Sequence, residues 1–224
     1  MEKIAQKFRN EEEIKKGNRI FVVHGVWEEE VKEIHGVKII FSGQNSLIKF
    51  HEGFNIKSLT IYVGEGCYLE FGKDFHVRFQ MTINAKANDT TLKIGNFANI
   101  GRAEFYMGDE PGLEVIIGDN FLQALDLYLR TADGHTIYDL NTKEILNKTK
   151  VGIHIGNHVW AGYNVTITKD AEIPDNCVIG TGAVVGKKQF EPNSIIAGVP
   201  AKTIRTGVNW DSHAICQYET LNPN

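Results

Sequence analysis

From Ile155 onward, apolar residues recur at every sixth position, and glycine or proline follows most of them. The eight six-residue units that begin there read IGNHVW, AGYNVT, ITKDAE, IPDNCV, IGTGAV, VGKKQF, EPNSII and AGVPAK. Their first position is mostly aliphatic, their second is mostly Gly or Pro, and their fifth is mostly small. Because glycine tolerates the backbone dihedrals of a corner and proline presets one of them, the pattern predicts short extended strands, each ending in a corner.

Neither an α-helix nor a hairpin sheet fits this period. The Gly and Pro content and the period itself exclude a helix, and hairpins would show a period of two with polar two-residue turns. Three six-residue units close one triangular coil, so Ile155 is expected to stack against Ile173, and Ala161 against Ile179 and then Ala197. Stacked coils would lie about 4.8 Å apart, the usual strand spacing.

The same corner recurs upstream at looser spacing, at Val63, Ile94 and Ile117. Each interval, including the last one from Ile117 to Ile155, is longer than a coil of three units and therefore implies an excursion from the coils. The last excursion is the longest, and it contains the sequence DGHTIYDLNTKEILNKTK. An insertion of that length in a tight solenoid is usually functional or disordered. We expect about seven coils, from near residue 39 to near residue 204.

The regular pattern weakens over residues 187–191. Gln189 and Glu191 are polar at positions that are apolar or small in the other units, whereas Phe190 between them is large and apolar. We therefore expect a one-residue bulge in this segment, with the Phe190 side chain turned toward the interior of the coils.

The segments outside the repeat divide the chain into three parts. Residues 2–16 predict a short polar helix that ends at Gly17. The last residues, which include Trp210, lack the period and are expected to pack on the outside of the coils. The expected parts are an N-terminal helix and cap over 1–38, the repeat over 39–206 with a loop over 130–152, and a C-terminal tail over 207–224.

Composition excludes several classes of protein. Of 224 residues, 42% are hydrophobic and 23% charged, which is typical of a globular chain and not of a disordered or collagen-like one. A formal charge of −4 argues against a partner that is a nucleic acid. Apolar runs such as 20–23 are too short to cross a bilayer, and no apolar block follows the charged first residues, so we expect a cytoplasmic protein with no secretory signal.

Three cysteines are too few and too scattered for a disulfide framework or a zinc site. Cys67 and Cys177 occupy the small fifth position, so we interpret them as core residues and not as nucleophiles. His154 and His158 flank a corner on the outer surface, but no third ligand lies at a matching position in a neighbouring coil. We therefore expect no metal ion.

The runs IGNHVWAGYNVTI, IPDNCVIGTGAVV and IIAGVPAKTIR resemble the hexapeptide-repeat acyltransferases, which fold as a left-handed parallel β-helix. They are most similar to the galactoside, maltose and polysaccharide O-acetyltransferases, and in particular to the polysaccharide or sialic acid branch. The resemblance is strong over 131–206, moderate over 61–130 and absent over 1–40 and in the tail. It implies an all-β fold whose left hand the general preference for right-handed crossovers would not predict.

The DGHTIYD run resembles the catalytic histidine loop of that family. Acetyl transfer to a hydroxyl requires a base for its proton and a donor for the tetrahedral oxyanion. Histidine suits the first role because its ordinary pKa lies near operating pH. The residues alone favour the interpretation of His135 as an ordinary exposed side chain; the resemblance implies instead that it is the general base of a direct attack. Asp133 beside it would orient the ring or contact the cofactor.

The resemblance also implies that acetyl-CoA is the acetyl donor. Trp160 would line the thioester site or donate to it, or else fill a subunit interface, and basic residues near the C-terminal coils would contact the phosphates or adenine. The residues expected to bind acetyl-CoA are Asp133, Gly134, Trp160, Gly162, Tyr163, Thr181, Gly182, Lys187, Lys202 and Arg205.

The acceptor is the least constrained part of the interpretation. Tyr106 and Arg130 are the candidate acceptor contacts, and further candidates in the first coils are Arg78, Phe105, Asp109 and Tyr128. The expected function is acetyl transfer to a sugar hydroxyl, of a capsular or cell-surface polysaccharide, by a homotrimer with each site between two subunits. Two alternatives remain open: N-acetylation of an amino-sugar nucleotide, which an aminated acceptor would reveal, and a non-catalytic scaffold, which acetyl-CoA would not stabilise.

Overall fold

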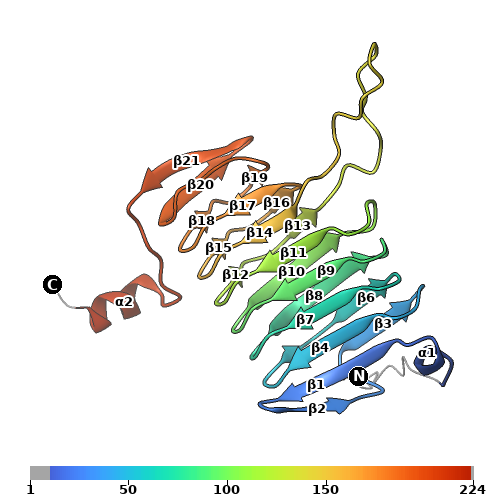
Figure 1. Cartoon of the computed structure of the whole chain (residues 1–224). Coiled ribbons are helices and arrows are strands. Elements are labelled where there is room, and N and C mark those ends of the chain that lie inside the picture. The colour runs from blue at the N-terminus through green and yellow to red at the C-terminus, as the bar shows by residue number, and fades with distance from the viewer. Residues whose placement is uncertain (1–10, 223–224) are drawn as a thin grey trace.

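Residues 11–222 are the residues that the structure describes, and in this computed structural model they wind into a left-handed parallel β-helix (Figure 1). One face is an eight-stranded sheet in which strands one coil apart pair in parallel. In chain order its members are β1 (Arg19–His24), β2 (Trp27–Glu30), β4 (Leu47–His51), β7 (Tyr68–Phe71), β9 (Thr91–Ile94), β11 (Glu114–Ile117), β14 (Gly152–Ile155) and β17 (Ala171–Ile173). β2 is reversed and pairs antiparallel with β1 at the N-terminal end.

The second sheet bends around the other two faces of the coils. Its longest strands, β8 (His76–Ala85) and β10 (Asn99–Tyr106), each run through the bend. Its other strands are β3 (Val37–Phe41), β5 (Asn55–Ile56), β6 (Leu59–Val63), β12 (Leu122–Gln123), β13 (Leu127–Arg130), β15 (Trp160–Ala161), β16 (Val165–Thr168), β18 (Val178–Ile179), β19 (Val184–Val185), β20 (Ser194–Gly198) and β21 (Ala201–Thr206). β21 is reversed and pairs antiparallel with β20.

The strand register confirms the six-residue period over most of the C-terminal coils. Ile155 pairs with Ile173 and Ala161 with Ile179, as a coil of three units predicts. The further expectation that Ile179 stacks against Ala197 is wrong, because Ile179 pairs with Ile196. The coil that contains residues 187–191 is therefore one residue shorter than three six-residue units, whereas the sequence predicts one additional residue there. Phe190 packs against the core from this segment, as predicted.

The upstream coils are wider than the repeat. Ile94 pairs with Phe71 below it and with Ile117 above it, so each of these coils contains more residues than three six-residue units supply. Val63 is not equivalent to these residues, because it lies in β6 on the other sheet and pairs with Ala85. The prediction of an excursion between Val63 and Ile94 is therefore wrong.

Side chains of two kinds fill the interior. Phenylalanines stack in the N-terminal coils, where the rings of Phe50 and Phe71 lie 4.5 Å apart and nearly parallel. Aliphatic and small residues fill the C-terminal coils, and both Cys67 and Cys177 are buried and free, as predicted. Phe105 is also fully buried in the core, which excludes it as an acceptor contact.

A ladder of short polar side chains holds one corner of successive coils. Asp119 Oδ1 accepts the backbone N–H of Asn96 at 2.7 Å, and Asp175 Oδ1 accepts that of Asn157 at 2.6 Å. Gly156 precedes Asn157, and a Cβ built on it would lie 2.3 Å from Asp175 Oδ1. The glycine of the corner motif is therefore required because the next coil passes so close.

The ends of the chain extend the coils on both sides. α1 (Glu11–Lys15) ends before Gly17, where the sequence predicts the helix to stop, while the earlier part of that predicted helix lies outside the described residues. β1 pairs in parallel with β4, so the stacked sheet extends upstream of residue 39. α2 (Ile215–Leu221) follows the last strand beside the coils (Figure 1). Within residues 11–222, no helix combines the length and apolar character needed to cross a membrane.

Candidate active site

The long excursion between β13 and β14 projects from the coils as a protruding loop (Figure 1). Its distal part doubles back, with an antiparallel bridge between Tyr138 and Ile145. Exposed His135 lies near its base, on the rim of a pocket of about 300 Å³. The pocket is lined by Asp109, Glu110, Gly134, His135, Thr136, Ile145, Asn147 and Lys148.

The turn before His135 wraps over an ion pair at the end of β13. Arg130 Nη2 donates to Asp109 Oδ2 at 2.8 Å and Nε donates to the Ala132 carbonyl at 2.7 Å, while the guanidinium lies 4.9 Å above the Tyr106 ring. Gly134 crosses this pair with φ +80°, and a Cβ there would lie 2.6 Å from Arg130 Nη2. The two predicted acceptor residues are thus part of the support of the histidine loop, and their role toward an acceptor stays a prediction.

Asp133 is held from two sides. Its carboxylate contacts Lys169 Nζ and accepts the side-chain amide of Asn147 at 2.9 Å. The neighbouring Lys169, together with Asn147, keeps the pKa of the Asp133 carboxyl below its usual range. These partners anchor the loop. An orienting effect of Asp133 on the His135 ring would therefore act through the backbone of the turn.

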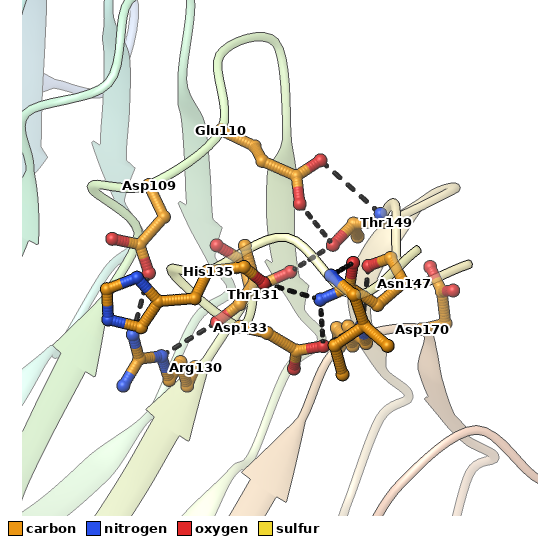
Figure 2. A network of polar contacts seen from close by, with 12 residues as sticks. Asp109, Glu110, Arg130, Thr131, Asp133, His135, Asn147, Thr149 and Asp170 are labelled. Carbon is orange, nitrogen blue, oxygen red and sulfur yellow. Dashed lines mark hydrogen bonds and ion pairs between the residues drawn. The ribbon is translucent and has the colours of Figure 1, made fainter. Parts of the chain in front are cut away.

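Sequence reasoning missed the residues of the returning segment of the loop. Asn147 bridges back to the turn, and Thr149 Oγ1 donates to the Thr131 carbonyl at 2.8 Å (Figure 2). Lys169, from the next coil, also donates to the Asn147 carbonyl at 2.6 Å. No local pattern marks these residues, because their partners lie at least 10 residues away in the sequence.

Trp160 lies on the outside of β15 and is 38% exposed. Trp210 from the tail stacks on His158 at 4.2 Å, donates its indole N–H to the His158 carbonyl at 2.8 Å and lies 6.0 Å from Trp160. This confirms that the tail packs on the coils and adds Trp210 to the candidate site. The resulting pocket of about 470 Å³ is lined by Trp160, Asn209, Trp210, Asp211, His213, Ile215 and Tyr218.

The corner after β15 gathers the other predicted contacts of the thioester arm. Gly182 N–H donates to the Tyr163 carbonyl at 2.9 Å, and a Cβ on Gly162 would lie 3.0 Å from the Thr181 nitrogen. A hydrogen bond to Asp126 raises the pKa of the Tyr163 hydroxyl, so this half-exposed group keeps its proton. The corner therefore allows close backbone approach, while the Tyr163 hydroxyl donates a hydrogen bond to Asp126.

The predicted phosphate contacts Lys187, Lys202 and Arg205 are exposed. Lys202 and Arg205 both lie on β21, opposite Ala197 and Ile195. Lys187 lies in the segment after β19. It adds a smaller contribution to the backbone hydrogen bonds that, against the effect of burial, keep the pKa of the Asp170 carboxyl below its usual value. The contact of these three residues with a cofactor stays a prediction.

The two outer histidines have other partners. His154 Nε2 lies 2.6 Å from Glu114, and His158 Nδ1 lies 3.1 Å from Asn176. Among the described residues, no three His, Cys, Asp or Glu side chains are grouped so that they could hold a metal ion.

His135 and Trp160 line two separate pockets of the single chain, and these pockets share no residue. The loop leaves the coils beyond β13 and β14, on the right of Figure 1, whereas β15 and β18 lie toward the left. A reaction that used both side chains would require a second subunit or movement of the loop.

No family model matches the sequence. The chain is 31% identical over 153 residues to the galactoside O-acetyltransferase of Escherichia coli K12, which covers 68% of this chain and 61% of that protein. It is 37% identical over 123 residues to the polysialic acid O-acetyltransferase of Neisseria meningitidis, which covers 55% of this chain and 56% of the relative. The chain thus spans about six tenths of the length of these curated relatives.

The solved structure of the polysialic acid O-acetyltransferase OatWY superimposes with a TM-score of 0.65 over 92% of this chain and 96% of that chain, at 24% identity. At that identity the match shows the fold, a left-handed β-helix. Together with the sequence relatives, it confirms the resemblance to the hexapeptide-repeat acetyltransferases.

Proposed function

We propose that this chain is an acetyl-CoA-dependent O-acetyltransferase that acts in the cytoplasm on a sugar hydroxyl of a capsular or cell-surface polysaccharide. Similarity to a galactoside and a polysialic acid O-acetyltransferase supports the reaction class and the saccharide acceptor. The observation that carries the proposal is the histidine loop itself. An exposed imidazole stands on the rim of a pocket, on a turn that an ion pair and a returning asparagine hold in place.

In the proposed reaction, His135 takes the proton of the acceptor hydroxyl as its oxygen attacks the thioester carbonyl. The tetrahedral oxyanion receives hydrogen bonds from donors at the corner formed by Trp160, Gly162 and Tyr163. The intermediate collapses by breaking the carbon–sulfur bond, and the imidazolium returns its proton to the departing thiolate. The products are the O-acetyl sugar and free coenzyme A.

The separation of His135 from Trp160 supports a homotrimer in which the loop of one subunit reaches the Trp160 face of the next. The loop also exposes apolar side chains that suit a protein neighbour, with Leu140 78% exposed. The others are Ile137, Tyr138, Ile145 and Leu146. Light scattering measures the state directly, and a monomer that retains full activity would contradict the shared site.

The decisive experiment is a screen of acetyl-CoA consumption against neutral, acidic and aminated saccharides. Wild type is expected to acetylate a hydroxylated acceptor. His135→Ala is expected to lower kcat by about 10²- to 10⁴-fold without changing the melting temperature, because the ring is exposed and outside the core. Normal turnover by His135→Ala would contradict the base, and preference for the aminated acceptors would contradict O-acetylation. If acetyl-CoA produced neither turnover nor a thermal shift, the chain would be a scaffold.

A further inference from the structure

We infer that Asn147 is the positioning residue of the histidine loop, and that its side-chain amide sets where the His135 imidazole stands; this inference rests on the proposed function. Asn147 returns to the base of the loop 12 residues after His135, and its side chain lies against the backbone of the turn (Figure 2). In this view the imidazole points toward Asp109, while Asn147 lies on the other side of the same turn.

Both the nitrogen and the oxygen of the Asn147 side-chain amide form hydrogen bonds. Its Nδ2 donates to the His135 carbonyl at 2.8 Å and to Asp133 Oδ2 at 2.9 Å, and its Oδ1 accepts the backbone N–H of Ile137 at 2.8 Å. These three partners bracket His135 on both sides in the sequence. A planar amide that binds all three restrains the two peptide units that follow the histidine Cα and the Asp133 side chain that precedes it, and therefore the direction of the His135 side chain.

Polar contacts, and not apolar packing, hold the turn. His135 and its neighbours in the loop are exposed, so burial contributes little there. The Arg130–Asp109 pair supports Gly134 from below, and Lys169 fixes Asp133 and the Asn147 carbonyl. Asn147 is the group that joins these anchors to the histidine backbone. Misplacement of a catalytic group by about 1 Å can cost roughly 10²-fold in rate.

The charges around this amide determine the choice of variant. Asn147→Asp keeps the shape and the acceptor for Ile137, but it removes both donations and places a second carboxylate beside Asp133. Repulsion between two adjacent carboxylates raises the pKa at which the pair takes up a proton, and a protonated carboxyl donates again. The titratable groups that face the pair are Asp109, Glu110, Arg130, His135, Lys148 and Lys169.

The test compares Asn147→Asp with Asn141→Asp, the same chemical change at the exposed tip of the loop. Asn147→Asp is expected to lower kcat roughly 10- to 100-fold and to leave the KM for acetyl-CoA within about twofold, because the Trp160 pocket is separate. The ratio of variant to wild-type kcat is expected to rise as pH falls from about 8 toward 5, as the pair takes up a proton. Asn141→Asp is expected to behave as wild type throughout.

A measurement without activity keeps the inference separate from the proposed reaction. The ring C–H resonance of His135, identified by its loss in His135→Ala, is expected to shift or broaden in Asn147→Asp and to stay unchanged in Asn141→Asp. Full kcat with an unchanged resonance would overturn the positioning role, as would a rise in KM alone. If wild type transferred no acetyl group, the proposed function would fail, and the resonance would still decide whether Asn147 positions the ring.

Discussion

The N-terminal and C-terminal halves of this solenoid differ in the length of their coils and in the size of the side chains that fill the interior. In the first sheet Phe50 pairs with Phe71 and Phe71 with Ile94, so these coils are longer than three six-residue units, and aromatic rings fill the wide interior. Between Ile155 and Ile173 the coil has shortened to three such units, and aliphatic and small side chains suffice. The perimeter of a coil and the size of the side chains inside it therefore change together.

The candidate site lies where the two halves meet. The coil from Ile117 to Ile155 is longer than the coil on either side of it, and its surplus forms the histidine loop. Arg130 of this coil pairs with Asp109 of the wide coil below it to support the turn, and the tight coil above it contributes Lys169. The difference between the halves shows that regularity provides the platform, whereas departure from the repeat provides the candidate site.

The wide coils are expected to be sensitive to loss of volume, and this is the largest effect that we predict on stability. Phe71→Ala removes a fully buried ring that stacks on Phe50. It is expected to lower the free energy of unfolding by about 3–5 kcal/mol, because a cavity remains. Urea denaturation measures the change; a loss below about 1 kcal/mol would mean that the wide coils collapse around the gap.

The tight coils are expected to be sensitive to added volume instead. Ala183 occupies the small fifth position and is fully buried. Ala183→Leu is expected to cost about 1–3 kcal/mol, because the larger side chain must displace its neighbours in a close-packed coil. The same denaturation experiment tests it, with the exposed position Lys188→Leu as the control. A gain in stability would show that the tight half contains unfilled space.

A tail residue is expected to affect binding more than folding. Trp210→Ala removes the ring that stacks on His158 and borders the Trp160 pocket. If that pocket takes acetyl-CoA, the KM for acetyl-CoA is expected to rise by roughly fivefold, in the range of one aromatic contact, with little change in kcat. Initial rates over a series of acetyl-CoA concentrations measure this, and an unchanged KM would remove Trp210 from the site.

The smallest predicted effect concerns the ion pair between the loop and the next coil. Lys169 lowers the pKa of Asp133 in the folded protein, so the contact is complete above the ordinary carboxyl range and is lost as pH falls through the lowered pKa. Lys169→Met is expected to raise the pKa of Asp133 toward its ordinary value. Titration of the carboxyl carbon by NMR follows it, and an unaltered titration would show that the ammonium does not act on Asp133.

The sequence predicts the strand register most accurately where the six-residue period is strict. Pairing of Ile155 with Ile173 follows from the six-residue repeat, because a coil without surplus residues has one register. The motif at Val63 gives a wrong prediction because residues inserted into the upstream coils interrupt the period. The sequence therefore does not show to which of the two sheets that corner belongs. The flanking residues of His135 mark it as a candidate. Asn147 carries no such mark, because its role depends on how the chain folds back.

The reversed strands at the two ends of the solenoid each cover one sheet edge. β2 covers the free edge of β1 with a run of glutamates over Glu28–Glu30, and β21 closes the opposite end against β20. A solenoid that ended in bare parallel strands would offer each edge to another copy, and such pairing can extend it without limit. The reversal of direction at each end of the coils thus removes one such edge, on one face of the coils at each end.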